Sequence, residues 1–226
     1  MFPRRYFPWF ERNGQFSALK LATLILLTLP AFWVFWEYWT ETLGPKPVIA
    51  AVREVGSWAV RFLILSLAVT PLRFAGGWGK LLIVRRMIGL AALFYLLVHF
   101  ALYTLDQQFD LVKIITEIAV RFYLTIGFVA LIGMLALGLT STDSIIKRIG
   151  GARWSRLHSL IYFIAPLGLL HFFLQAKLEI YEPVLVTGLF FVLMADRQLR
   201  KFGAPKQGWR ARAMGKRPSC ASVGMC

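Results

Sequence analysis

Six long, nearly uninterrupted apolar runs dominate this sequence. They cover residues 18–38, 56–72, 84–105, 118–139, 155–176 and 182–197. An α-helix needs about 20 residues to cross the hydrocarbon core of a bilayer, whereas strands of a membrane β-barrel alternate apolar and polar residues over about ten positions. Hydrophobic residues make up 58% of the 226-residue chain, and its charged residues gather between the runs. The sequence therefore predicts an all-α membrane bundle of six transmembrane helices.

The runs leave no room for a soluble domain between them. We expect a cytoplasmic N-terminal segment at 1–17, the six-helix domain at 18–198, and a basic, disordered tail at 199–226. The first run follows several arginines, as in a secretory signal, but it is too long for one and lacks a small-residue cleavage site. Cys220 and Cys226, the only cysteines, lie in the tail and form neither a metal-binding motif nor a haem-attachment motif.

Basic residues mark one side of the predicted bundle. With a cytoplasmic N-terminus, the inner segments carry Arg4, Arg5, Arg12, Lys20, Arg73, Lys80, Arg85, Arg86, Lys147, Arg148, Arg153, Arg156 and the basic residues from Arg197 to Arg217. The outer segments carry only Lys46, Arg53, Lys113 and Lys177. This asymmetry predicts that both termini face the cytoplasm. The net charge of +15 does not indicate a nucleic-acid partner, because these cations lie beside spans and meet acidic membrane lipids first.

The only three histidines, His99, His158 and His171, all lie inside apolar runs. An ionisable side chain in hydrocarbon indicates function. The third and fifth runs both cross from inside to outside, so His99 and His171 fall at a similar outer depth. His158 falls near the inner surface, roughly 20 Å of helix from His171. Because imidazole is a common axial ligand of haem iron, we expect His99 and His171 to hold one haem. The alternative is that each ring bonds to a neighbouring serine, tyrosine or carbonyl group.

Several arginines are candidates for contacts with an anionic cofactor. A second haem held by His158 would need another histidine on the third run, fourteen residues before His99, where a helix returns to nearly the same face. Arg85 occupies that position, so His158 has no histidine partner. Arg85 and Arg86 are suited to haem propionates or a flavin phosphate, or they are membrane anchors. Arg61, near the outer end of the second run, is suited to propionates or reaches the headgroups.

The motifs also show a resemblance to a known family. The matching stretches are Ser57 to Leu72, which ends in Val-Thr-Pro-Leu; Arg85 to Leu90, leading to His99; Arg121 to Gly127; Leu139 to Thr142; and Trp154 through His158 to His171. Over about residues 55–198 the chain resembles the haem-binding membrane subunits of bacterial periplasmic methionine-sulfoxide reductase systems. These belong to the ferric reductase-like transmembrane family, which includes the membrane domain of NADPH oxidases. The wider family's second histidine on the third span is absent, and Arg85 occupies its place.

The resemblance implies haem b, with His99 and His171 as outer ligands and His158 near an inner site, and it implies flavin mononucleotide (FMN). It further implies a periplasmic molybdopterin-containing partner that reduces methionine sulfoxide in oxidised proteins. The chain lacks a glycine-rich dinucleotide fingerprint, so we expect electrons from the quinone pool or a cytosolic flavin reductase. The function expected is that of an electron carrier. Alternatives are a self-contained ferric or quinone reductase, or a proton or ion path through the histidines and Arg85.

Overall fold

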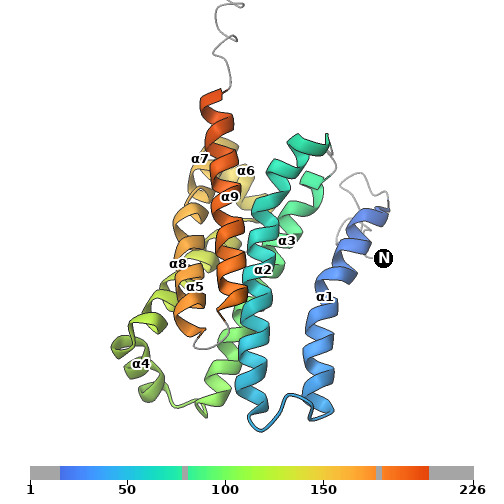
Figure 1. The fold of residues 1–226 in the computed structure, drawn as a ribbon. Helices are drawn as coiled ribbons and strands as arrows, with labels where there is room; N and C mark the ends of the chain where they lie inside the picture. Colours follow the sequence, from blue (N-terminus) through green and yellow to red (C-terminus); the bar gives the residue numbers. More distant parts are fainter. Residues whose placement is uncertain (1–15, 78–80, 177–179, 204–226) are drawn as a thin grey trace, which may run out of the picture.

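The computed structural model describes residues 16–77, 81–176 and 180–203, and these ranges form α-helices joined by short connections (Figure 1). The helices are α1 (Ala18–Trp39), α2 (Pro47–Gly76), α3 (Leu81–Asp106), α4 (Leu111–Val120), α5 (Phe122–Leu139), α6 (Asp143–Ile149), α7 (Gly151–His158), α8 (Ile161–Gln175) and α9 (Tyr181–Gly203). The all-α prediction is confirmed for these residues. Most of the proposed N-terminal segment and tail, including Cys220 and Cys226, lies outside them.

Among the described residues, five helical segments are long and apolar enough to cross a membrane: α1, α2, most of α3, α5, and Gly151–Gln175, which joins α7 and α8. This is the pattern of a multi-pass membrane protein. The sixth predicted run does form a helix, α9, but every 18-residue stretch of it holds at least three charged residues, drawn from Glu182, Asp196, Arg197, Arg200 and Lys201. A sixth crossing therefore stays a prediction.

The predicted helix over 118–139 is wrong at its start. Arg121 has an extended backbone (φ −95°, ψ 103°), which separates α4 from α5. The Arg121 N–H still bonds to the Glu117 carbonyl, and its guanidinium pairs with the Glu117 carboxylate. Both contacts tie Arg121 to the last turn of α4. Helix α4 turns away from the other helices at the lower left of Figure 1, and its Leu111 and Val112 side chains are exposed.

The fifth predicted run is also interrupted. Helix α7 ends at His158 and α8 begins at Ile161, and the Leu160 N–H bonds to the Leu157 carbonyl in a tight turn between them. Pro166 lies within α8. The interruption therefore directly follows His158 and lies before Pro166.

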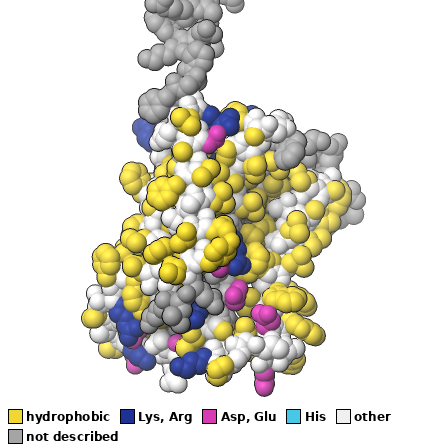
Figure 2. Space-filling model, viewed as in Figure 1, with side chains coloured by type: hydrophobic (Ala, Val, Ile, Leu, Met, Phe, Trp, Pro, Cys, Tyr) yellow, Lys and Arg dark blue, Asp and Glu magenta, His cyan; other side chains and the backbone are white. Residues whose placement is uncertain are grey.

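Two helix pairs organise the bundle. Helix α2 packs along α3 and α5 along α8, while α3 also contacts α1 and α5, and α2 contacts α9. Many large hydrophobic side chains are exposed, and Figure 2 shows them over much of the visible face, with most charged side chains toward its two ends. This distribution suits a flank that faces lipid.

Tyr95 of α3 joins α1 to this core. Its hydroxyl donates to the Leu27 carbonyl at 2.8 Å and accepts from the Ala31 N–H at 2.8 Å. These two groups would bond to each other in an uninterrupted helix, and Pro30 beside them lacks an N–H. A polar group inserted beside a proline is a common cause of helix bending. The Tyr95 side chain is only 2% exposed, so this bridge is buried inside the bundle.

We predict that Tyr95→Phe destabilises the protein. The substitution leaves a buried carbonyl and N–H without the bridging hydroxyl, which costs about 1–3 kcal/mol and lowers the midpoint of thermal unfolding in detergent by several degrees. Tyr38→Phe is the matched control, because Tyr38 lies on α1, the helix to which Tyr95 bonds, and is 47% exposed. Equal midpoints for the two variants would contradict the role given to the hydroxyl.

Candidate functional site

His99 of α3 is fixed by the neighbouring helix α2. Its Nδ1 donates to the main-chain carbonyl of Val52 at 2.8 Å. Gly56 stands one turn after Val52, and a Cβ atom at this glycine would lie 2.7 Å from the His99 Nδ1. Because a helical side chain covers the turn before it, a glycine at 56 leaves the Val52 carbonyl open to the imidazole.

His171 of α8 is held by α5 in the same way. Its Nδ1 donates to the carbonyl of Tyr123 at 2.7 Å. Gly127, again four residues after the carbonyl, would place a Cβ atom 2.6 Å from the His171 Nδ1. The Tyr123 ring also lies stacked near the imidazole, with ring centres 6.3 Å apart. Both helix pairs thus hold a histidine through a carbonyl and a glycine one turn later.

These hydrogen bonds determine which nitrogen is available in each ring. A carbonyl oxygen accepts only, so Nδ1 carries the proton and Nε2 keeps its lone pair. Metal-binding histidines usually donate their second ring nitrogen to a carbonyl or carboxylate, which fixes the tautomer and the ring orientation. His99 and His171 therefore have the form of two metal-binding imidazoles.

The two rings also have the separation that a shared metal ion requires. Their centres are 6.4 Å apart and their planes are at 82°. A metal–nitrogen bond is about 2.0 Å long, so two imidazoles on opposite sides of one ion have ring centres roughly 6–6.5 Å apart. This separation is compatible with two ligands of one haem iron, and the assignment of His99 and His171 as those ligands stays a prediction. A haem with two histidine ligands carries electrons rather than binding a substrate at the iron.

His158 lies apart from this pair and is bonded at both nitrogens. Its Nδ1 is 3.2 Å from the Trp154 carbonyl, and its Nε2 is 3.1 Å from the Ser141 hydroxyl. The Trp154 ring packs against it, with ring centres 4.1 Å apart. These contacts are of the kind named as the alternative to metal binding. The assignment of His158 as a metal ligand stays a prediction, and such a role would require Ser141 to release Nε2.

Arg85 and Arg86 belong to this inner group. Both lie close enough to His158 for their charges to act on its ring. The Arg86 guanidinium forms an ion pair with Asp143, at the start of α6. The structure thus brings together the three residues assigned to the inner level, although their contact with a cofactor stays a prediction.

Arg61 has a protein partner. Its guanidinium pairs with the Glu182 carboxylate, with Nη2 2.6 Å from Oε1, and lies over the Trp58 ring at 4.5 Å. This ion pair joins α2 to the first turn of α9. Since both side chains are about one-third exposed, the pair contributes at most about 1 kcal/mol. The assignment of Arg61 to a propionate stays a prediction.

The roles of Gly56 and Gly127 were not recognised in the sequence. Each lies in an apolar run, where glycine weakens a helix by roughly 0.5–1 kcal/mol relative to alanine. The one sign in the sequence that could have indicated these roles is that each glycine lies within an apolar run that contains neither His99 nor His171. Their role depends on helix pairing, which a single sequence does not show.

Comparison with known proteins identifies relatives that match most of this chain. Residues 55–169 match the family described as "Ferric reductase like transmembrane component". A relative from Rhodospirillum rubrum is 40% identical over 79% of this chain and 86% of its own length. Relatives from Xanthomonas oryzae (41%; 83% and 85%) and Azospira oryzae (37%; 83% and 81%) carry the same description. Each is named the haem-binding subunit MsrQ of protein-methionine-sulfoxide reductase.

The chain belongs to the MsrQ family. The matched region, residues 55–169, contains Gly56, Gly127 and His158, whereas His171 lies just beyond it. The family resemblance noted from the motifs is thus confirmed.

We predict that Gly127→Ala disturbs the His171 position. The added Cβ has no room beside the ring, and overpacking of this kind costs about 1–3 kcal/mol, seen as a lower midpoint of thermal unfolding. Gly168→Ala is the control, because Gly168 lies on α8 with His171 and a Cβ there meets nothing within 4 Å. A Gly127→Ala variant as stable as Gly168→Ala would refute the close approach.

Proposed function

We propose that this chain is a transmembrane electron carrier that passes electrons through haem b, held by His99 and His171, to a periplasmic molybdenum-dependent methionine-sulfoxide reductase. The observation that carries the proposal is the separation of 6.4 Å between two imidazole rings whose Nδ1 atoms both bond to main-chain carbonyl groups. The names of the relatives, which are haem-binding subunits of protein-methionine-sulfoxide reductase, support both the cofactor and the partner.

The residues of the chain prepare the site rather than perform bond chemistry. A bound haem supplies one-electron oxidation and reduction. The Val52 and Tyr123 carbonyls accept hydrogen bonds from the Nδ1 atoms of the two rings. These bonds make each Nε2 lone pair more basic and therefore a better metal ligand. Phe100 of α3, directly after His99, and Phe128 of α5, directly after Gly127, pack against each other in a tilted arrangement, with ring centres 6.0 Å apart, and help to join the two helices.

Electrons enter, in this proposal, at the end of the bundle that carries Arg85, Arg86 and His158. Quinol or a reduced flavin donates there, and the two arginines suit the phosphate of FMN. This end faces the cytoplasm of a bacterial inner membrane, with α9 as the sixth span. Support for that topology comes from Figure 1, where the start of α1 and the end of α9 lie at the same end of the bundle. The chain then acts as the electron-transfer subunit of the system, and its partner as the catalytic reductase.

We predict that His99→Ala and His171→Ala each abolish the outer haem signal, because either change removes one of two axial ligands. His158→Ala is the matched control, since it alters a histidine whose nitrogens bond to Ser141 and Trp154, and it is expected to spare much of the signal. A pyridine-haemochrome spectrum with haem-to-protein stoichiometry measures the effect. Equal loss in all three variants would contradict the assignment of the outer pair.

A colourless purified protein would reject the proposal and favour a proton or ion path. We further predict that reduced haem is fully and quickly reoxidised by a catalytic amount of the periplasmic partner with excess methionine sulfoxide, only to the extent of the partner's own oxidised cofactor when the sulfoxide is omitted, and slowly by methionine sulfoxide alone. Stopped-flow absorbance in the Soret region measures these rates. Steady turnover of ferric iron or quinone without the partner would instead identify a self-contained reductase.

A further inference from the structure

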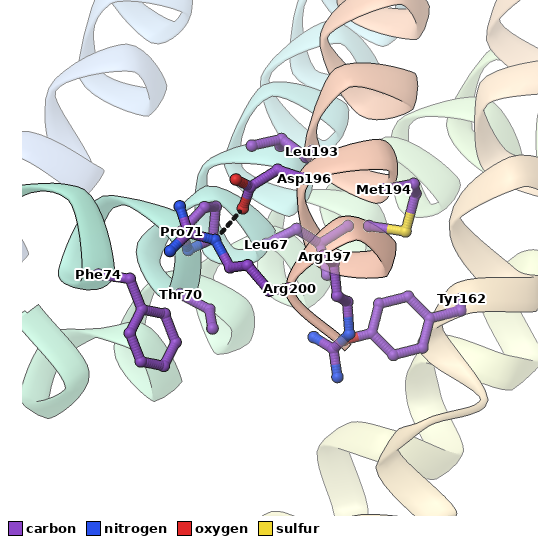
Figure 3. Close-up of a pocket in the computed structure, with 10 residues that line it drawn as sticks. All are labelled: Leu67, Thr70, Pro71, Phe74, Tyr162, Leu193, Met194, Asp196, Arg197 and Arg200. Carbon is purple, nitrogen blue, oxygen red and sulfur yellow. Dashed lines mark hydrogen bonds and ion pairs between the residues drawn. The ribbon is translucent and has the colours of Figure 1, made fainter. Parts of the chain in front are cut away.

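A cavity of about 240 Å³ opens between the last turns of α2 and the C-terminal half of α9. Figure 3 shows its lining, to which Leu67, Leu193 and Met194 contribute apolar walls. Tyr162, one turn after His158, forms part of it from α8. In the proposed topology this cavity lies at the cytoplasmic end of the bundle.

Positive charge surrounds the cavity. The Arg197 guanidinium lies 4.4 Å from the centre of the Tyr162 ring, and Arg200 lies 5.4 Å from that of Phe74. A third guanidinium, that of Arg73, lies at the same distance of 5.4 Å from the Phe74 ring. The only carboxylate in the lining is that of Asp196, which accepts a hydrogen bond from Arg200 Nε at 2.7 Å (Figure 3). The lining thus holds two guanidinium groups and one carboxylate, and Arg73 lies outside it beside the Phe74 ring, which leaves an excess of positive charge.

The cavity also contains polar groups without their usual partners. The Thr70 hydroxyl oxygen is buried and has no hydrogen-bond partner among the described residues. Pro71, next to it in α2, has no N–H to donate to the Leu67 carbonyl. A buried polar group without a partner is costly, so these groups favour a ligand that makes hydrogen bonds.

We propose that this cavity binds the phosphate headgroup of an acidic phospholipid from the cytoplasmic leaflet. Guanidinium groups match phosphate oxygens in charge and geometry, and basic pockets between spans on the cytoplasmic side are a known form of lipid site. A lipid is favoured over a soluble phosphate because the apolar walls adjoin a face of α9 where Leu189 and Val192 are exposed. Acyl chains would cover that face. This site is separate from the histidine pair and does not depend on the proposed electron transfer.

The test uses the full chain in neutral detergent, titrated with phosphatidylglycerol or phosphatidylcholine and measured by native mass spectrometry. We expect one tightly retained phosphatidylglycerol per chain. Arg197→Gln should weaken its binding about fivefold, the effect of removing one basic residue near an acidic headgroup. Arg153→Gln is the control, because Arg153 is an exposed arginine at the same end of the bundle and outside the cavity lining. It should alter binding by less than about twofold.

Two further variants separate binding from folding. Arg197→Lys keeps the charge and should retain most of the affinity. Thr70→Val removes a hydroxyl that has no partner, so it should weaken lipid binding without lowering the midpoint of thermal unfolding. Equal binding by Arg197→Gln, Thr70→Val and Arg153→Gln would overturn the proposal. So would equal retention of phosphatidylcholine, or displacement of the lipid by inorganic phosphate, FMN or a quinol at concentrations comparable to that of the lipid.

Discussion

A hydrogen bond from a histidine Nδ1 to a main-chain carbonyl of the neighbouring helix organises the centre of this bundle. The carbonyl groups of Val52 and Tyr123 already belong to helices, and each uses a second lone pair to accept the imidazole. This arrangement needs a helix surface without a side chain one turn later, which Gly56 and Gly127 provide. The same contact sets the distance between two helices, the tautomer of a ring and the direction of its free nitrogen.

The contact occurs twice, once in each of the two main helix pairs. Helix α3 presents His99 against α2, and α8 presents His171 against α5. Each pair alone positions one imidazole, and the packing of α3 against α5 brings the two rings to their separation of 6.4 Å. A cofactor bound between them would therefore link the two halves of the bundle.

The sequence predicted much of this arrangement because its main signals are local. Long apolar runs indicated the helices, and the direction of the third and fifth runs brought His99 and His171 to one depth. The break at Arg121 was missed because it lies inside a continuous apolar run, where an apolar count gives no sign that the backbone becomes extended at one residue. Arg61 was assigned without knowledge that Glu182, 121 residues later, lies beside it. Contacts of this kind depend on how helices pair, and no single segment encodes them.

The bridge made by Tyr95 has a consequence for the order of assembly in the membrane. Helix α1 leaves the ribosome well before Tyr95, which lies 64 residues after Ala31. Until α3 arrives, the Leu27 carbonyl and the Ala31 N–H have only each other as partners in the hydrocarbon. Docking of α3 provides each of them with a bond to the Tyr95 hydroxyl. The attachment of α1 at this point therefore forms only during assembly, once α3 has reached its place.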